Sequence, residues 1–232
     1  MSRGVQLQTM LTNLRVEIGH SSSSALGQNV REALVEVLQR TQKQLWEDHD
    51  WPFLYTKQLL PLQAGQRYYN LPSVLTLERV YKIYIKEGGV WRLLHNGIGA
   101  KEYNLHDSDI DERSDPARAW EGYGSNQIEI WPIPETNGVV STFEGYIRVE
   151  GIQNLSTFVS NTDTADLDDT LLVLHAAAEW LARQKSSDAD AKFQLATKHY
   201  NRLKNRLRKK TTVSLVPPEP MYDHHSRPPR VE

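Results

Sequence analysis

The chain has 232 residues, 39% of them hydrophobic, which is enough for one large domain or two small ones with a packed core. It has no cysteine, so disulfides and thiolate metal sites are excluded. The formal net charge is −2, but residues 198–232 carry nine basic and three acidic side chains, so a basic end follows an acidic body. No apolar run has the length of a membrane span, and we expect a soluble cytoplasmic protein.

Two helices are predicted before residue 53. Residues 5–18 repeat apolar side chains at helical spacing, and a glycine at position 19 is a plausible stop. Residues 24–50 form a longer amphipathic helix. Pro52 disfavours helical geometry at the residue before it, so this helix should end near Asp50. Its apolar face is made of Leu26, Val30, Leu34, Val37, Thr41 and Leu45.

A strand-rich segment follows, from residue 53 to residue 150. It is rich in β-branched and aromatic residues and contains glycine-rich turns at residues 87–89 and 124–126. A polar stretch at residues 95–116 interrupts it, with a helical turn near residues 99–103. We predict an antiparallel β module whose six or seven strands lie at residues 53–60, 66–71, 77–85, 90–94, 117–123, 127–131 and 140–149.

Helical spacing returns in the last third of the chain. A helix is predicted at residues 167–183, where Asp166, Asp168 and Asp169 suit the positive end of the helix dipole. Residues 186–188 cap a further helix. Its predicted seam consists of Phe193, Ala196, Tyr200, Leu203 and Leu207.

The predicted fold class is α+β. Residues 1–52 and 160–210 should form a four-helix bundle, with Leu34, Val37, Leu174 and Leu203 in its core. The antiparallel β module of residues 53–150 is inserted into this bundle. Residues 211–232 contain five prolines and no helical or strand period, so they should be an extended C-terminal tail.

The sequence motifs indicate no enzyme, cofactor or metal. The acidic stretch at residues 107–112 resembles the start of a calcium loop, but Glu112 and Arg118 stand where that loop needs Gly and Glu. The adjacent pair His224 and His225 lacks further ligands at fixed spacing. His175 lies on an apolar helix face and should be a hydrogen-bonded core or interface residue. No nucleophile, metal or phosphate-binding motif is present, although acids, serines and histidines distant in sequence could still converge in space.

Candidate partner-binding residues lie in the basic last helix and in the tail. Residues 198–210 carry seven cationic side chains and no acid, which fits an outer helix face, nucleic-acid phosphates or an acidic protein equally well. The tail adds apolar residues among prolines, which suits docking in an extended form. The aromatic residues of the β module should be mostly core, with some at an interface. The candidates are Arg202, Arg206, Lys209, Lys210, Val213, Leu215, Val216 and Tyr222.

The order of these parts resembles the head-to-tail connector, or adaptor, proteins of tailed bacteriophages of the short-tailed type. The resemblance rests on a long helix that ends in a Trp-x-x-x-x-Trp-Pro-Phe segment (residues 46–53), on Tyr69-Asn-Leu-Pro72 and on Ile130-Trp-Pro-Ile-Pro134. A helix capped by acidic residues, a basic last helix and an extended tail complete it. It covers most of the chain.

The resemblance implies a structural virion protein in the neck, assembled in the host cytoplasm. It implies a ring of twelve copies beneath the portal protein, tail nozzle or tail fibre proteins docked below, and DNA only as passing cargo, with no membrane partner. A nucleic-acid-binding regulator that uses the basic last helix is the alternative function. An enzyme with an unrecognised site is a third.

Overall fold

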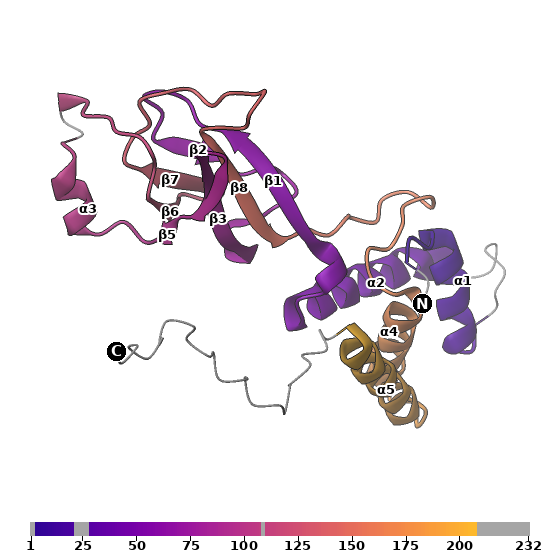
Figure 1. The fold of residues 1–232 in the computed structure, drawn as a ribbon. Helices are drawn as coiled ribbons and strands as arrows, with labels where there is room; N and C mark the ends of the chain where they lie inside the picture. The colour runs from indigo at the N-terminus through magenta and orange to yellow at the C-terminus, as the bar shows by residue number, and fades with distance from the viewer. Residues whose placement is uncertain (1–2, 21–27, 108–109, 208–232) are drawn as a thin grey trace, which may run out of the picture.

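The computed structural model describes residues 3–20, 28–107 and 110–207, which form a helical part and a β-rich part (Figure 1). The helical part combines helices from both sides of the β-rich segment: α1 (Leu7–Glu17), α2 (Gln28–Asp48), α4 (Asp169–Arg183) and α5 (Ala189–Leu207). The mixed α+β architecture predicted from the sequence is confirmed.

The four long helices share one hydrophobic core. Leu34, Val37 and Leu203 are buried in it, as their spacing predicted. The segment that returns from the β-rich part adds Phe158 and Leu167 to the same core. The first and last helices of the described chain are therefore stabilised by one another, because neither pair buries its apolar face alone.

The predicted four-helix bundle is not what the structure shows. α4 packs closely against α5 and also contacts α1 and α2, whereas α1 and α2 meet over a short stretch only. Because α4 has neighbours on most of its sides, its core residues are not confined to one stripe. Leu174 is half-buried at its outer edge, so its predicted core position is wrong. Phe193 was predicted in the α5 seam but is 58% exposed.

The first sheet of the β-rich part is antiparallel, with strand order β1-β8-β3-β4. Its strands are β1 (Tyr55–Pro61), β3 (Val80–Glu87), β4 (Val90–Leu93) and β8 (Tyr146–Ile152). One face packs into a second hydrophobic core through Ile83, Ile85, Ile147 and Val149. The alternation of a strand directs the residues between them to the opposite face.

The second sheet has strand order β2-β7-β6-β5. Its strands are β2 (Tyr68–Asn70), β5 (His95–Asn96), β6 (Ala119–Tyr123) and β7 (Gln127–Trp131). β5 pairs with β6 in parallel, so the prediction of a purely antiparallel module is wrong at this edge. The short helix α3 (Ala100–Leu105) is tied to the sheet by a 2.8 Å hydrogen bond from Trp131 Nε1 to the Glu102 carbonyl.

The last strand starts later than predicted, at Tyr146 rather than near residue 140. Phe143 and Gly145 have φ angles of 57° and 66°, in the left-handed region that a strand does not use. The described residues hold eight strands in place of the six or seven expected, because the two-residue strand β5 carries no periodic signal.

The tryptophans of residues 46–53 join the two parts. Trp51 is buried, and its Nε1 donates to the Leu45 carbonyl at 2.9 Å, which folds the chain back on the end of α2. Trp46 Nε1 donates to the carbonyl of Gln153, just after β8, at 3.0 Å. A Cβ at Gly151 would lie 2.3 Å from the Arg79 carbonyl oxygen, so a glycine is required where β8 passes this junction.

Candidate interaction surfaces

Arg202 lies on the exposed side of α5, in a hydrogen-bonded chain that reaches the start of α4. Its Nη2 donates to His199 Nδ1 at 2.8 Å. A guanidinium has no acceptor, so Nδ1 is the acceptor and the ring proton is on Nε2. His199 Nε2 then donates to Asp168 Oδ1, also at 2.8 Å. These two hydrogen bonds fix the direction in which the Arg202 side chain leaves α5.

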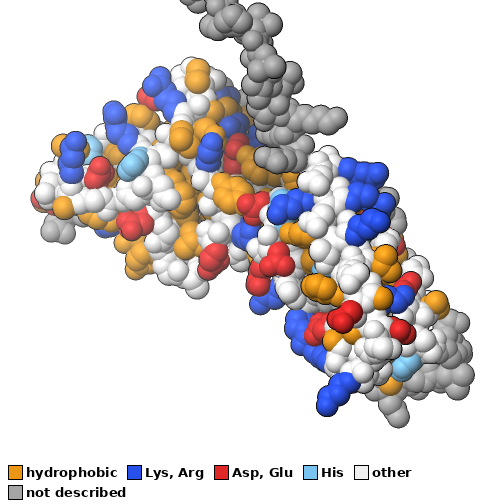
Figure 2. Space-filling model, turned by 90° about the horizontal axis from the view of Figure 1, so that it is seen from below, with side chains coloured by type: hydrophobic (Ala, Val, Ile, Leu, Met, Phe, Trp, Pro, Cys, Tyr) orange, Lys and Arg blue, Asp and Glu red, His pale blue; other side chains and the backbone are white. Residues whose placement is uncertain are grey.

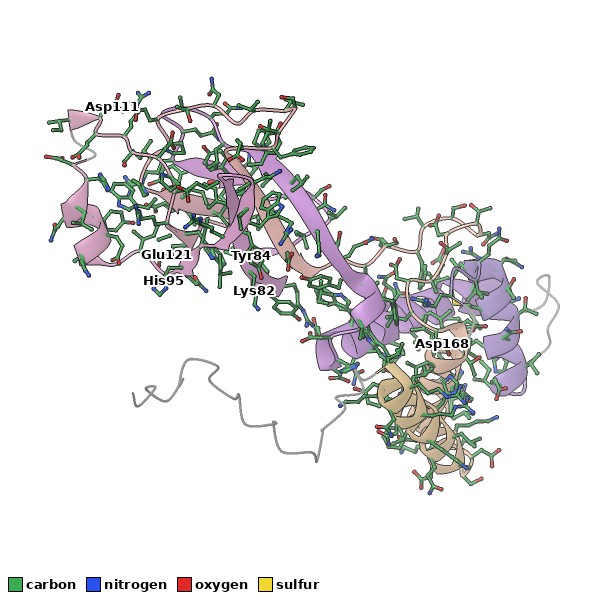
Figure 3. All side chains as sticks on the ribbon, viewed as in Figure 1. Lys82, Tyr84, His95, Asp111, Glu121 and Asp168 are labelled. Carbon is green, nitrogen blue, oxygen red and sulfur yellow. The ribbon has the colours of Figure 1, made fainter. Side chains whose placement is uncertain are left out.

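Asp168, labelled in Figure 3, is the buried carboxylate at which this series of hydrogen bonds ends. Its Oδ1 also accepts from the backbone N–H of Leu171 at 3.0 Å, which caps the N-terminus of α4. One carboxylate therefore starts α4 and holds α5 against it. The sequence placed Asp168 at a helix start but gave no link to His199; the three-residue spacing of His199 and Arg202 was the available signal.

The predicted partner-binding residues divide into two groups. Arg202 and Arg206 are exposed on α5, and Arg206 makes no hydrogen bond or ion pair with the described residues. The other predicted residues lie outside the described part of the chain, as does the His224–His225 pair. They are Lys209, Lys210, Val213, Leu215, Val216 and Tyr222.

A cavity of about 500 Å³ opens between α2, α4 and α5. Its lining includes Asp48 of α2, His175 of α4, and Asp190 and Phe193 of α5. Burial lowers the pKa of His175, an effect opposed by the charge of Asp48 and reinforced by His199. His175 Nε2 is buried and has no hydrogen-bond partner among the described residues, so the hydrogen bond predicted for this histidine is not found at that nitrogen.

The open face of the first sheet combines cations and aromatic rings. The Arg148 guanidinium lies 4.7 Å from the centre of the Tyr84 ring and 4.6 Å from that of Trp91. Lys82 lies two positions before Tyr84 on β3 and is therefore on the same face of the first sheet (Figure 3). Cations beside aromatic rings suit a protein interface.

Glu150 is the carboxylate of this face. It pairs with Arg148 at 2.9 Å and with Lys57 at 3.5 Å, and it accepts a hydrogen bond from the Tyr55 hydroxyl. Burial and that hydrogen bond raise the pKa of Tyr55 to about 12, so its hydroxyl stays a donor at neutral pH.

Other aromatic residues of the β-rich part are structural. Arg67 pairs with Glu129 at 2.8 Å, and the Tyr103 hydroxyl donates to the same carboxylate at 2.8 Å. The Arg67 guanidinium also lies 5.0 Å from the centre of the Trp131 ring. This cluster holds α3 against the second sheet, in line with the prediction that most aromatic residues serve the core.

The described ranges contain no group of three or more His, Cys, Asp or Glu side chains arranged to hold a metal ion. None of the helices resolved in these ranges has the length and apolar character needed to cross a membrane.

The model of the SU10 adaptor protein family matches residues 5–221, across both the helical and the β-rich parts. The chain belongs to the SU10 adaptor protein family. The predicted resemblance to phage head-to-tail adaptors is thereby confirmed, and with it a phage adaptor role in general, in association with portal and tail components of the virion neck. No curated protein matches the chain.

Proposed function

We propose that copies of this SU10-family adaptor form a ring beneath the portal protein, through which DNA passes and below which tail components dock. The family match over residues 5–221 carries the proposal. Twelve copies are expected, to match the portal ring that the resemblance implies. The nozzle or fibre proteins of the tail are the expected lower partners.

The shape of the subunit supports this role. The helical and β-rich parts lie at opposite ends of an elongated molecule, so one copy can contact two partners at once (Figure 2). The helical part carries the exposed Arg206 in the last turn of α5, which suits an acidic surface of the portal. The β-rich part carries the open sheet face with Arg148 and Trp91, which suits a tail protein.

The charge distribution fits DNA as cargo. Residues 1–197 carry a net charge of −8, and a ring with an acidic body does not retain phosphates that pass through it. The basic residues near the C-terminus then serve an outward contact. The proposal includes no catalytic step and no required metal.

Electron microscopy of the full chain mixed with purified portal particles tests the proposal. A ring coaxial with the portal is expected, and light scattering of the chain alone should give a monomer or a small species. A stable dodecamer without portal would contradict portal-dependent assembly. Absence of portal binding, together with salt-dependent DNA binding, would replace the adaptor role by the regulatory one.

Removal of residues 211–232 tests the predicted role of the tail. The melting temperature should stay nearly unchanged, because too few apolar residues are present there to offset the entropy of ordering them in a free subunit. Portal binding should weaken at least tenfold. Normal assembly of the shortened chain would remove the tail residues from the proposed portal contact.

A further inference from the structure

We infer that neighbouring copies in the ring contact each other through two unlike sides of α5, a groove side on one copy and a basic side on the next. The groove side comprises Asp48, Asp190, Phe193 and the cavity beside them. The basic side comprises Leu174, Leu195, Lys198 and Arg202, which line a second hollow of about 280 Å³ together with His199. The inference rests on the proposed ring.

The two sides lie on opposite flanks of one helix. Phe193 and Leu195 are two positions apart, which places them about 200° apart around a helix of 3.6 residues per turn. Both are more than half exposed, at 58% and 52%. Ala196 and Leu203 are buried against α4 between these flanks. A single copy therefore cannot cover either apolar side chain with the other.

The charges of the two sides are opposite. Asp48 and Asp190 are exposed and form no ion pair within the described ranges, unlike the nearby Glu179, which pairs with Arg40 and Arg183. Arg202 on the other flank, and Lys198 on the outer face of α5 between the flanks, have no carboxylate partner in the part of the chain that is described. Opposite unpaired charges on one chain fit a second copy of that chain.

The apolar features are complementary as well. Phe193 projects at the rim of the groove side, whereas Leu174 and Leu195 line a mostly apolar hollow on the basic side. An aromatic side chain that enters an apolar hollow is a frequent centre of binding energy in an interface. His175 also lines the groove, and its buried Nε2 has no hydrogen-bond partner among the described residues. In the proposed contact this nitrogen lies on the side that faces the neighbouring copy's Lys198 and Arg202.

Head-to-tail contact follows from this difference between the two sides. A twofold contact through the basic side would bring the Lys198 and Arg202 cations of one copy against the same cations of the other, which like-charge repulsion disfavours. Contact between unlike sides leaves one free side at each end of a pair, so copies add until a ring closes.

Cysteine cross-linking tests the contact in assembled rings, since the chain has no cysteine of its own. Full-length chain carrying both Phe193→Cys and Leu195→Cys is assembled on portal particles and oxidised. A ladder of cross-linked copies on a denaturing gel is expected. The single variants Phe193→Cys and Leu195→Cys are matched controls and should give no cross-linked dimers.

The outcomes distinguish failure of the proposed ring from failure of the proposed contact between its copies. Rings on portals without a ladder in the double variant would overturn the head-to-tail contact and leave the adaptor role intact. Dimers of either single variant would show a twofold contact and overturn it as well. Absence of rings with the unmodified chain would overturn the proposed function and this inference together.

A charge exchange gives a second readout. Asp48→Lys with Asp190→Lys should reduce ring formation at least tenfold, and so should Lys198→Glu with Arg202→Glu. A chain that carries all four changes has the charges of its two sides exchanged, so it should form rings again. The control exchange, Glu87→Lys with Arg92→Glu in an exposed ion pair of the β-rich part, should leave assembly unchanged. Failure of the fourfold variant to regain rings while it binds portal would contradict the pairing.

Discussion

The Arg79 guanidinium stacks on Trp46, 4.2 Å from the ring centre, and its Nη2 donates a 2.7 Å hydrogen bond to the Trp46 carbonyl. Nη1 pairs with Asp50 at 2.7 Å. Arg79 stands immediately before β3, and Trp46 lies in the last turn of α2, whose carbonyls lack partners within the helix. One side chain therefore caps α2 and fixes the first sheet to the helical part.

Arg79→Ala should lower the free energy of unfolding by about 2 kcal/mol, because it leaves the Trp46 carbonyl without its charged donor and removes the ion pair with Asp50. Urea denaturation measures the change. Arg92→Ala is the matched control, since the Arg92 side chain is 66% exposed in a surface ion pair, and it should change stability by less than about 0.5 kcal/mol. Equal losses in the two variants would contradict the structural role of Arg79.

A second prediction compares two leucines that the sequence treats alike. Leu34→Ala should lower the free energy of unfolding by about 3 kcal/mol, because Leu34 is fully buried between the helices. Leu174→Ala should cost about 1 kcal/mol or less, because Leu174 is half-buried beside a surface hollow. Thermal unfolding of both variants under one condition gives the ranking. A Leu174→Ala loss as large as that of Leu34→Ala would place Leu174 in the core after all.

Those leucines also show how far the sequence determines the fold. Helical period identified α1, α2, α4 and α5, because each buries an apolar face. It identified part of the buried side of α4, including Leu171, Ala178 and Leu181, but wrongly placed Leu174 in the core, since this helix has neighbours on most sides. Strand alternation predicted most strands but not the parallel edge strand β5, which depends on a partner distant in sequence.

The candidate surfaces depend on tertiary contacts in the same way. The basic residues of α5 were visible as a charge run, so Arg202 and Arg206 were predicted. The groove was not, because Asp48 and Asp190 come from helices separated by the whole β-rich part. The link between Asp168 and His199 was missed for the same reason: spacing within one helix does not report the side chains of another.

The Asp168–His199 hydrogen bond leads to a third prediction. Asp168→Ala should lower stability by about 2 kcal/mol, because the cap of α4 and the acceptor for His199 are both lost. Asp168→Asn should cost less, because its amide oxygen can still accept from Leu171 N–H. Urea denaturation gives the order. If the Asn and Ala variants were equally unstable, the cap would contribute nothing to the effect.

The last prediction concerns pH. Burial lowers the pKa of His175, and burial together with Lys204 lowers that of His49. Near and below pH 6.5, His175 and His49 therefore bind protons more readily in the unfolded chain than in the folded protein. The free energy of unfolding should fall as the pH is lowered from 7.5 to 5.5. The carboxylates whose pKa values are lowered act in the same direction only at more acidic pH, near and below their ordinary values.

His175→Gln should reduce this slope, because the variant has no proton to bind at that position in either state. His49→Gln with His175→Gln should reduce it further. Urea midpoints at several pH values between 7.5 and 5.5 measure the slope for each protein. An unchanged slope in His175→Gln would mean that the folded protein accepts a proton at His175 as readily as the unfolded chain does. The groove between α2, α4 and α5 would then be open to water, and only below pH 6.5 would His175 face the cations of a neighbouring copy as a cation itself.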